Sequence, residues 1–239
     1  MALLTIDNAK TTKGEDLGYM TGIVYMIPDD KLCPKASTGC RNACLVSAGR
    51  GNMKNVYDAR ERRSMLWHKS KEAFCAMLEE EIFKLERKAK RAGKKLCIRL
   101  NGTSDIVWEQ VRQFGGKNIF NAYPHIQFYD YTPNEMRFRS AHMVKNIPAN
   151  YHMTYSLKED NKKQALNVLS KGHNVAVVFR KELPSHWHGY KVIDGDKHDL
   201  RFLDGQNVVV GLKAKGKARK DTSGFVQDVE DTNTVQEVA

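Results

Sequence analysis

Short apolar segments recur along this sequence, and they constrain its fold more than any other feature. The segments expected to form strands are residues 21–27, 96–100, 126–131, 152–156, 175–179, 190–193 and 208–212. They are β-branched, aromatic and nearly continuous, as is typical of parallel strands covered on both faces. The early segments follow one another at about 23–29 residues, which fits βα units. The pattern predicts an α/β fold whose parallel sheet, of about seven strands, forms an open or incompletely closed barrel.

The longest stretch between predicted strands, residues 52–93, has the periodicity of helices. Phe74, Leu78 and Ile82 recur at four-residue steps and indicate a long amphipathic helix that ends at Gly93. The later connections, after residue 179, are too short for comfortable helices. Helical or irregular segments are expected at residues 105–114, 133–144 and 161–172.

The chain has 239 residues, of which 41% are hydrophobic, enough for a sizeable core. We expect one α/β domain at residues 21–225, with a cysteine loop at 33–44. Residues 1–20 are polar and turn-rich, which predicts an N-terminal arm. Residues 226–239 are acidic and poor in apolar side chains, so they predict a flexible tail.

The formal net charge of +11 indicates attraction to polyanions, of which nucleic acid is the usual one. The basic residues concentrate in 84–95 and in 213–220. The first group fits the solvated face of a helix. The second has few apolar residues to bury, so it predicts either a flexible segment that contacts phosphate or the rim of a pocket.

The clearest chemical signal is a loop with three cysteines, Cys33, Cys40 and Cys44, in the spacing C-x6-C-x3-C. The loop follows the first predicted strand and is bent by Pro34 and Gly39. Thiolates this close together can converge on one metal centre. With three cysteines and no obvious fourth ligand, the loop suits a [4Fe–4S] cluster that leaves one iron open.

Zinc is the main alternative metal, and a closed structural zinc site would need a fourth ligand. His68, Cys75 and Cys97 are the candidates for that ligand. A disulfide framework is less favoured, because the five cysteines are odd in number and the N-terminus lacks the features of a signal peptide. No apolar run approaches the roughly 20 residues needed to cross a membrane. We therefore expect a cytoplasmic protein with reduced thiols and no membrane partner.

Polar side chains follow the predicted strands, at the edge where parallel α/β folds bind ligands. We expect eight of these residues to form a polar pocket over the metal centre and to orient a cofactor or substrate there. They are Asn101, Gly102, Thr103, Ser104, Asp105, Asp130, Ser156 and Arg180.

The cysteine loop also resembles a phrase found in uncharacterised bacteriophage proteins, C-P-x-A-S-x-G-C-x3-C-L-x3-G-R-G. Residues 33–51 match that phrase throughout, and the likeness extends to about Phe225. The resemblance implies a phage origin, and hence the cytoplasm of a host cell. It brings no established activity.

The order of a strand, a three-cysteine loop, a helix and a strand ending in small polar residues resembles the radical S-adenosylmethionine (SAM) fold. That family has a partial α/β barrel with a [4Fe–4S] cluster on three cysteines, and SAM chelates the fourth iron. The resemblance implies that residues 101–104 stand where the family contacts the methionyl amine. The usual spacing there is C-x3-C-x2-C with a Gly-Gly-Glu segment. This chain has neither, which leaves SAM binding open.

Three functions are therefore carried forward from the sequence. The first is a phage iron–sulfur protein with a radical-SAM-like barrel, which is an enzyme if the open iron binds SAM or another small molecule. The second is a phage factor without catalysis, in which a metal staples a surface that binds nucleic acid or a host protein. The third is a metal-dependent nuclease that uses the carboxylates of Asp105, Asp130, Asp194 and Asp196.

Overall fold

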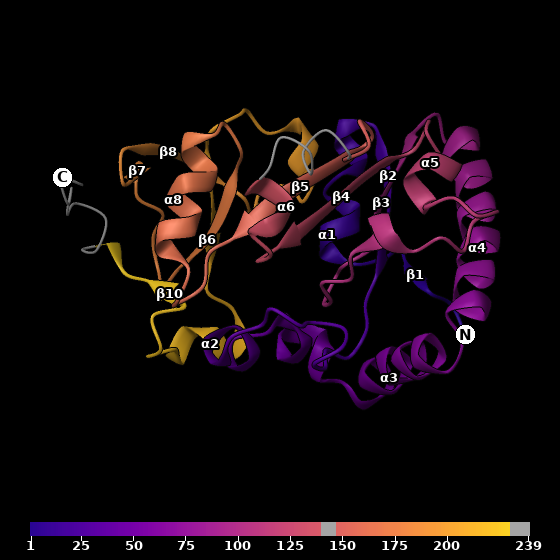
Figure 1. The fold of residues 1–239 in the computed structure, drawn as a ribbon, viewed down its shortest axis with the longest axis horizontal. Coiled ribbons are helices and arrows are strands. Elements are labelled where there is room, and N and C mark those ends of the chain that lie inside the picture. The colour runs from indigo at the N-terminus through magenta and orange to yellow at the C-terminus, as the bar shows by residue number, and fades with distance from the viewer. Residues whose placement is uncertain (140–146, 230–239) are drawn as a thin grey trace.

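The computed structural model describes residues 1–139 and 147–229 and contains one curved, mostly parallel sheet (Figure 1). Within those residues the sheet has ten strands, in the order β1-β2-β3-β4-β5-β6-β9-β8-β7, with β10 also paired to β6. Every pair is parallel except β1–β2 and β7–β8. The sheet is not closed.

The strands are short, as expected for βα units. Their bounds are β1 Leu4–Thr5, β2 Tyr19–Val24, β3 Lys95–Arg99, β4 Gln127–Thr132, β5 Tyr151–Ser156, β6 Val175–Phe179, β7 His186–Trp187, β8 Tyr190–Asp194, β9 Val209–Lys213 and β10 Val226–Gln227.

Two long helices lie between β2 and β3, and the remaining helices are brief. The α-helices are α1 Ala9–Thr12, α2 Thr38–Asn42, α3 Lys54–Lys69, α4 Lys71–Arg91, α5 Ile119–Ala122, α6 Met136–Arg139 and α8 Lys162–Ser170. The 3-10 helices are η1 Glu15–Leu17, η2 Leu45–Ser47, η3 Gly49–Asn52, η4 Trp108–Gln110, η5 Arg201–Leu203 and η6 Gly216–Lys220.

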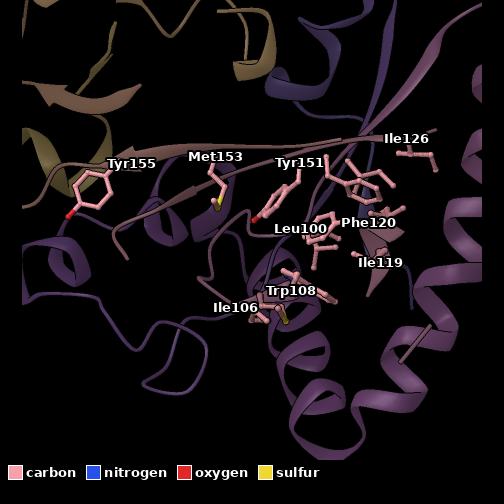
Figure 2. Packing of buried hydrophobic residues seen from close by; sticks show 14 of the residues in the cluster. Leu100, Ile106, Trp108, Ile119, Phe120, Ile126, Tyr151, Met153 and Tyr155 are labelled. Carbon is pink, nitrogen blue, oxygen red and sulfur yellow. The ribbon is translucent and has the colours of Figure 1, made fainter. Parts of the chain in front are cut away.

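One face of the sheet is covered by helices, and the main hydrophobic core lies there. The apolar stripe of α4 packs against alternate residues of β3 such as Ile98. Figure 2 shows side chains of this core from β5 and α5; the rings of Tyr151 and Phe120 are stacked with centroids 4.0 Å apart. This packing explains the 3.6-residue period of the sequence before β3.

The opposite face of the sheet is covered by the connection between β8 and β9. Leu200 and Phe202 from this connection pack against Cys97 of β3 and Tyr129 of β4. The ring centroids of Tyr129 and Phe202 are 5.7 Å apart. Because successive side chains of a strand point to opposite faces, each strand sends odd and even residues into two different environments.

The seven strands expected from the sequence are all present within a few residues of the predicted bounds. The structure has ten strands where about seven were expected, since β1, β7 and β10 have only two residues each and leave no apolar run. Residues 1–20, expected as an arm, contribute β1 and α1. The tail expected at 226–239 begins with β10, and its residues from 230 onward lie outside the described residues.

Among the described residues, no helix has both the length and the apolar character that a membrane span requires.

Candidate metal centre

Cys33, Cys40 and Cys44 line the same pocket, whose volume is about 310 Å³. The pocket lies at the carboxyl edge of the parallel strands, where residues 101–105 follow β3 and Ser156 ends β5. In Figure 1 the segment that carries the cysteines and α2 runs along this edge, beside the C-terminal segment drawn in yellow. None of the five cysteines, all of which are described, forms a disulfide.

Local hydrogen bonds shape the cysteine loop. The Asp29 carboxylate accepts hydrogen bonds from the backbone N–H groups of Lys31 and Leu32, both at 2.8 Å, and so forms a turn before Cys33. Ser37 is the N-cap of α2, and its hydroxyl accepts a hydrogen bond from the Cys40 N–H at 3.3 Å. The short helix therefore fixes where Cys40 leaves the backbone.

Glu159, just after β5, holds this loop to the sheet edge. Its Oε1 accepts a hydrogen bond from the Gly39 N–H, and its Oε2 accepts one from the Ser37 hydroxyl, both at 2.7 Å. A Cβ added at Gly39 would lie 2.7 Å from Glu159 Oε2, so a larger residue would require the Glu159 side chain to shift. The neighbouring Lys158 donates to the Lys35 carbonyl at 3.0 Å.

A second anchor joins the loop to the turn after β3. The Asp105 N–H donates to the Leu32 carbonyl at 2.7 Å, and the Cys33 thiol donates to the Thr103 carbonyl at 3.7 Å. Gly102 packs so closely on β2 that an added Cβ would lie 2.5 Å from the Val24 carbonyl oxygen. Cys33 is thus held beside residues 101–105 by contacts on both sides.

The three thiols share an environment that disfavours negative charge in the absence of a metal. Burial, together with Asp105 and the other two cysteines, raises the pKa of Cys33 to about 12. Burial and Cys44 raise the pKa of Cys40 to about 11, and burial raises the pKa of Cys44. Cys40 and Cys44 thus act on the thiol of Cys33, and Cys44 acts on that of Cys40. A metal cation would stabilise all three thiolates and displace their protons.

Asn101 organises the turn that follows β3. Its side-chain oxygen accepts hydrogen bonds from the Ser104 hydroxyl at 2.9 Å and from the Ile106 N–H at 3.0 Å. The Thr103 hydroxyl donates to the Met26 carbonyl at 2.6 Å. Asn101 and Thr103 line the pocket, but these side chains hold the backbone in place.

Asp105 is the carboxylate of this turn that lines the pocket. It is 5% exposed, and its polar neighbours are the Thr132 hydroxyl and the Arg137 guanidinium. The nearest cation, Arg137 Nη1, is 3.9 Å from Oδ1. Burial raises the pKa of Asp105 to about 6, against the opposing effects of Thr132 and Arg137. A buried carboxylate of this kind can accept hydrogen bonds from a bound ligand.

Two of the expected site residues lie outside the pocket. Asp130 points to the helix-covered face of β4 and accepts hydrogen bonds from the Asn101 N–H at 2.7 Å and from the Tyr151 hydroxyl at 3.0 Å. Arg180 does not line the pocket and instead pairs with the C-terminal segment. Its Nε–H donates to the carboxylate of Asp228, next to β10, at 2.7 Å. Ser156, by contrast, lines the pocket with residues 101–105.

The residues considered as a fourth zinc ligand are likewise elsewhere. His68 Nε2 is 2.6 Å from Asp29 Oδ2, in a contact on the outside of the loop. Cys75 is a buried residue of α4, and Cys97 is buried on the opposite face of the sheet, with its sulfur 3.3 Å from the Thr21 hydroxyl. None of the three lines the pocket of the cysteine loop.

Within the described residues, no group of three or more His, Cys, Asp and Glu side chains is arranged so that it could hold a metal ion. The carboxylates of the nuclease hypothesis also do not converge. Asp130 lies on the helix-covered face, and Asp196 forms an ion pair with Lys215 at 2.5 Å. The three cysteines therefore remain the only set of expected metal ligands, among the described residues, that shares one pocket.

Sequence reasoning missed Lys10 and Lys13, which come from the segment expected as an arm. Both line the far end of the pocket, together with His198 from the β8–β9 connection. Lys10 Nζ is 3.4 Å from Asp199 Oδ1, and Lys13 donates to the Asp196 carbonyl. No local pattern marks these lysines, because the fold brings α1 to residues nearly two hundred positions away.

Comparison with known proteins gives one match. A family model described as gene product 88 matches residues 2–229, which is nearly the whole chain. Neither the curated proteins nor the solved structures contain a significant match.

Proposed function

The chain belongs to the gene product 88 family, and we propose that this member is an iron–sulfur protein with a [4Fe–4S] cluster on Cys33, Cys40 and Cys44. The family match agrees with the resemblance of the cysteine loop to uncharacterised phage proteins. The observation that carries the proposal is that the three thiols line one pocket at the carboxyl edge of a parallel sheet. His68, Cys75 and Cys97, the other candidate ligands from the sequence, do not line this pocket.

The donor set fits a cluster better than a single zinc ion. Three thiolates on one tetrahedral zinc would be only about 3.8 Å from one another, given a Zn–S distance of roughly 2.3 Å. The three candidates for a fourth ligand, His68, Cys75 and Cys97, do not line the pocket, so a closed four-ligand zinc site lacks its last side chain. In a cubane each thiolate binds a different iron, so the sulfurs stand further apart around a larger body. A pocket of about 310 Å³ has room for such a group at one end.

The pocket would also admit a ligand at the iron that lacks a cysteine. A site-differentiated cluster can supply an electron to a ligand bound there or act on it as a Lewis acid. Asp105, a buried carboxylate that lines the pocket, would accept hydrogen bonds from an amine or hydroxyl of that ligand. The Ser156 hydroxyl and the Lys158 ammonium line the wall on the β5 side and would help to orient it.

A more specific proposal, that the fold and function are of radical SAM type, rests on the order of the secondary-structure elements. A parallel strand, β2, leads into the cysteine loop, and the next strand, β3, ends in the Asn101-Gly102-Thr103-Ser104 turn beside Cys33. The open parallel sheet curves so that β3 and the segment after β8 meet through Arg99 and Asp199. We propose that the protein is an enzyme of radical SAM type, or one that has lost that activity.

Anaerobic reconstitution with iron and sulfide tests the proposal. We expect the wild-type protein to take up about four irons per chain. The triple variant Cys33→Ala, Cys40→Ala, Cys44→Ala should take up none, and circular dichroism will report whether it keeps its secondary structure. Equal iron uptake by both proteins would show that the cysteine loop does not hold a cluster. A change in the EPR spectrum on addition of SAM would support the radical SAM reading, and an unchanged spectrum would count against it.

A second candidate function rests on the exposed basic segment η6. Lys217 and Lys220 of η6 line a shallow hollow with Arg41 of α2, on the outside of the cysteine loop. In this alternative a metal staples the surface, which binds nucleic acid or a host protein without catalysis. Affinity that falls steeply with salt, and a flatter salt dependence in a Lys215→Gln, Lys217→Gln, Arg219→Gln variant, would favour it. An unchanged salt dependence would exclude this role for η6.

A further inference from the structure

The end of the pocket opposite the cysteine loop carries an excess of positive charge. We call the side chains of Lys10, Lys13, Lys213 and Lys215 at this end the lysine cluster. Lys10 and Lys13 come from the N-terminal segment around α1, and Lys213 and Lys215 come from the end of β9 and the residues that follow it. Two segments far apart in the sequence thus bring their ammonium groups to the same end of the pocket.

The carboxylates at this end are too few to balance the cations. Asp199 is shared between Lys10, at 3.4 Å, and the buried Arg99, at 3.0 Å. Asp196 pairs with Lys215 at 2.5 Å, and Lys13 donates to its backbone carbonyl. Among the described residues, the Lys213 ammonium has no carboxylate within ion-pair distance; only its backbone N–H is used, in a bond to Asp196.

A phosphate group would complete this arrangement. Like charges gathered around one cavity repel one another unless an anion is present, and ammonium groups are common ligands of phosphate. The pocket as a whole is lined by six cations and three carboxylates, and a dianion or trianion would offset the excess. The cations are Lys10, Lys13, Arg99, Lys158, Lys213 and Lys215, and the carboxylates are Asp105, Asp196 and Asp199.

Part of the pocket wall is apolar. It is formed by Ala176 and Val178 of β6, Leu212 of β9 and the half-buried ring of Phe225. Such a surface suits a flat organic ring, which can pack against an aromatic side chain.

We propose that the pocket binds a small nucleotide, with its phosphates on the lysine cluster and its base on the apolar wall near Phe225. The proposal names a substrate class for the site described above, and to that extent it rests on the proposed function. Nucleotide binding and iron content are nevertheless separate measurements on the same protein. A nucleotide that binds to iron-free protein would support this inference even if the cluster assignment failed.

Calorimetric titration with adenosine diphosphate, adenosine and inorganic pyrophosphate tests the proposal on the full chain. We expect adenosine diphosphate to bind one site per chain, about tenfold or more tighter than adenosine, since each charge-assisted hydrogen bond contributes to binding. It should also bind tighter than pyrophosphate, which lacks a ring. If pyrophosphate binds as tightly as adenosine diphosphate, the site recognises free phosphate and the nucleotide proposal is overturned. If adenosine binds as tightly as adenosine diphosphate, the lysine cluster does not bind phosphate.

Lys213→Gln and Lys217→Gln form a matched pair of variants. Both lysines are exposed and lie four residues apart, but only Lys213 lines the pocket. We expect Lys213→Gln to raise the Kd for adenosine diphosphate about tenfold and to leave the Kd for adenosine unchanged. Lys217→Gln should change the Kd less than about twofold. Equal losses in the two variants would mean general attraction to a basic surface and would overturn the proposal.

Discussion

Arg99 at the end of β3 donates a hydrogen bond to Asp199, one hundred residues later in the chain, at 3.0 Å. Both side chains are about 5% exposed, and the guanidinium also lies over the Tyr131 ring, 4.5 Å from its centroid. The pair joins one half of the sheet to the segment after β8. It therefore holds the curved edge on which the candidate site is built.

Replacing Asp199 by Asn should destabilise the protein by about 3–5 kcal/mol at pH 7, because Arg99 would remain buried without its counter-charge. Burial alone would raise the pKa of Asp199, but Lys10, Arg99 and Arg201 hold that pKa well below its ordinary value. The carboxylate therefore stabilises the fold above pH 4 and loses this effect as the pH falls further. Urea unfolding of wild type and variant at pH 7 and pH 3 measures the loss of stability and its dependence on pH.

The difference in unfolding free energy between wild type and Asp199→Asn should be smaller at pH 3 than at pH 7. An equal difference at both values would contradict the assignment of a depressed pKa. Asp30→Asn provides a control, because Asp30 is 90% exposed in its pair with Arg41. That change should have little effect on stability.

Cys40→Ala is predicted to lose the bound metal and much of the stability of the cysteine loop, since a cluster ligand and its folding energy are removed together. Cys75→Ala is the matched control, because Cys75 is a buried core residue of α4 that does not line the pocket. Iron analysis after identical anaerobic purification measures the difference. Full iron content in Cys40→Ala would remove Cys40 from the ligand set.

Glu159→Gln should loosen the cysteine loop without touching a thiol. The carboxylate accepts hydrogen bonds from both Ser37 and Gly39, whereas an amide turns one acceptor into a donor. We expect faster loss of iron to a chelator at unchanged ligand number. Asp160→Asn, at the exposed neighbouring position, should lose iron at the wild-type rate. Similar rates for Glu159→Gln and wild type would show that the anchor is dispensable.

Lys10 should react with acetic anhydride at a lower pH than an ordinary lysine. Burial, partly offset by Asp199, lowers the pKa of Lys10 to about 8. Lys54 serves as the internal reference, because Asp58 raises its pKa. Mass spectrometry of peptides labelled between pH 7 and pH 10 compares the two. Parallel labelling of Lys10 and Lys54 would contradict the lowered pKa of Lys10.

The sequence predicted the parallel α/β sheet because its strands are continuous apolar runs buried between two layers, and such runs need no tertiary information to be recognised. The same rule placed the cysteine loop and residues 101–105 at one edge. It could not separate the two faces of β4. Asp130 and Tyr131 are adjacent in the sequence, but Asp130 points to the helix-covered face and Tyr131 to the pocket.

The basic end of the pocket could not be predicted for a different reason. Lys10 reaches the site through Asp199, 189 residues away, and no local period encodes such a contact. Arg180 is the opposite case, a residue predicted for the site that does not line the pocket. The prediction rested on its position at the end of a strand. Its guanidinium is instead taken by Asp228, beside the two-residue strand β10, which is too short to be recognised in the sequence.

Iron, zinc and acid-labile sulfide in the protein as isolated, from cells and columns kept free of oxygen, test the central claim most directly. The account predicts about four irons and four sulfides per chain, with little zinc. One zinc per chain without sulfide would contradict it, and the basic surface around η6 would then become the first place to look for function.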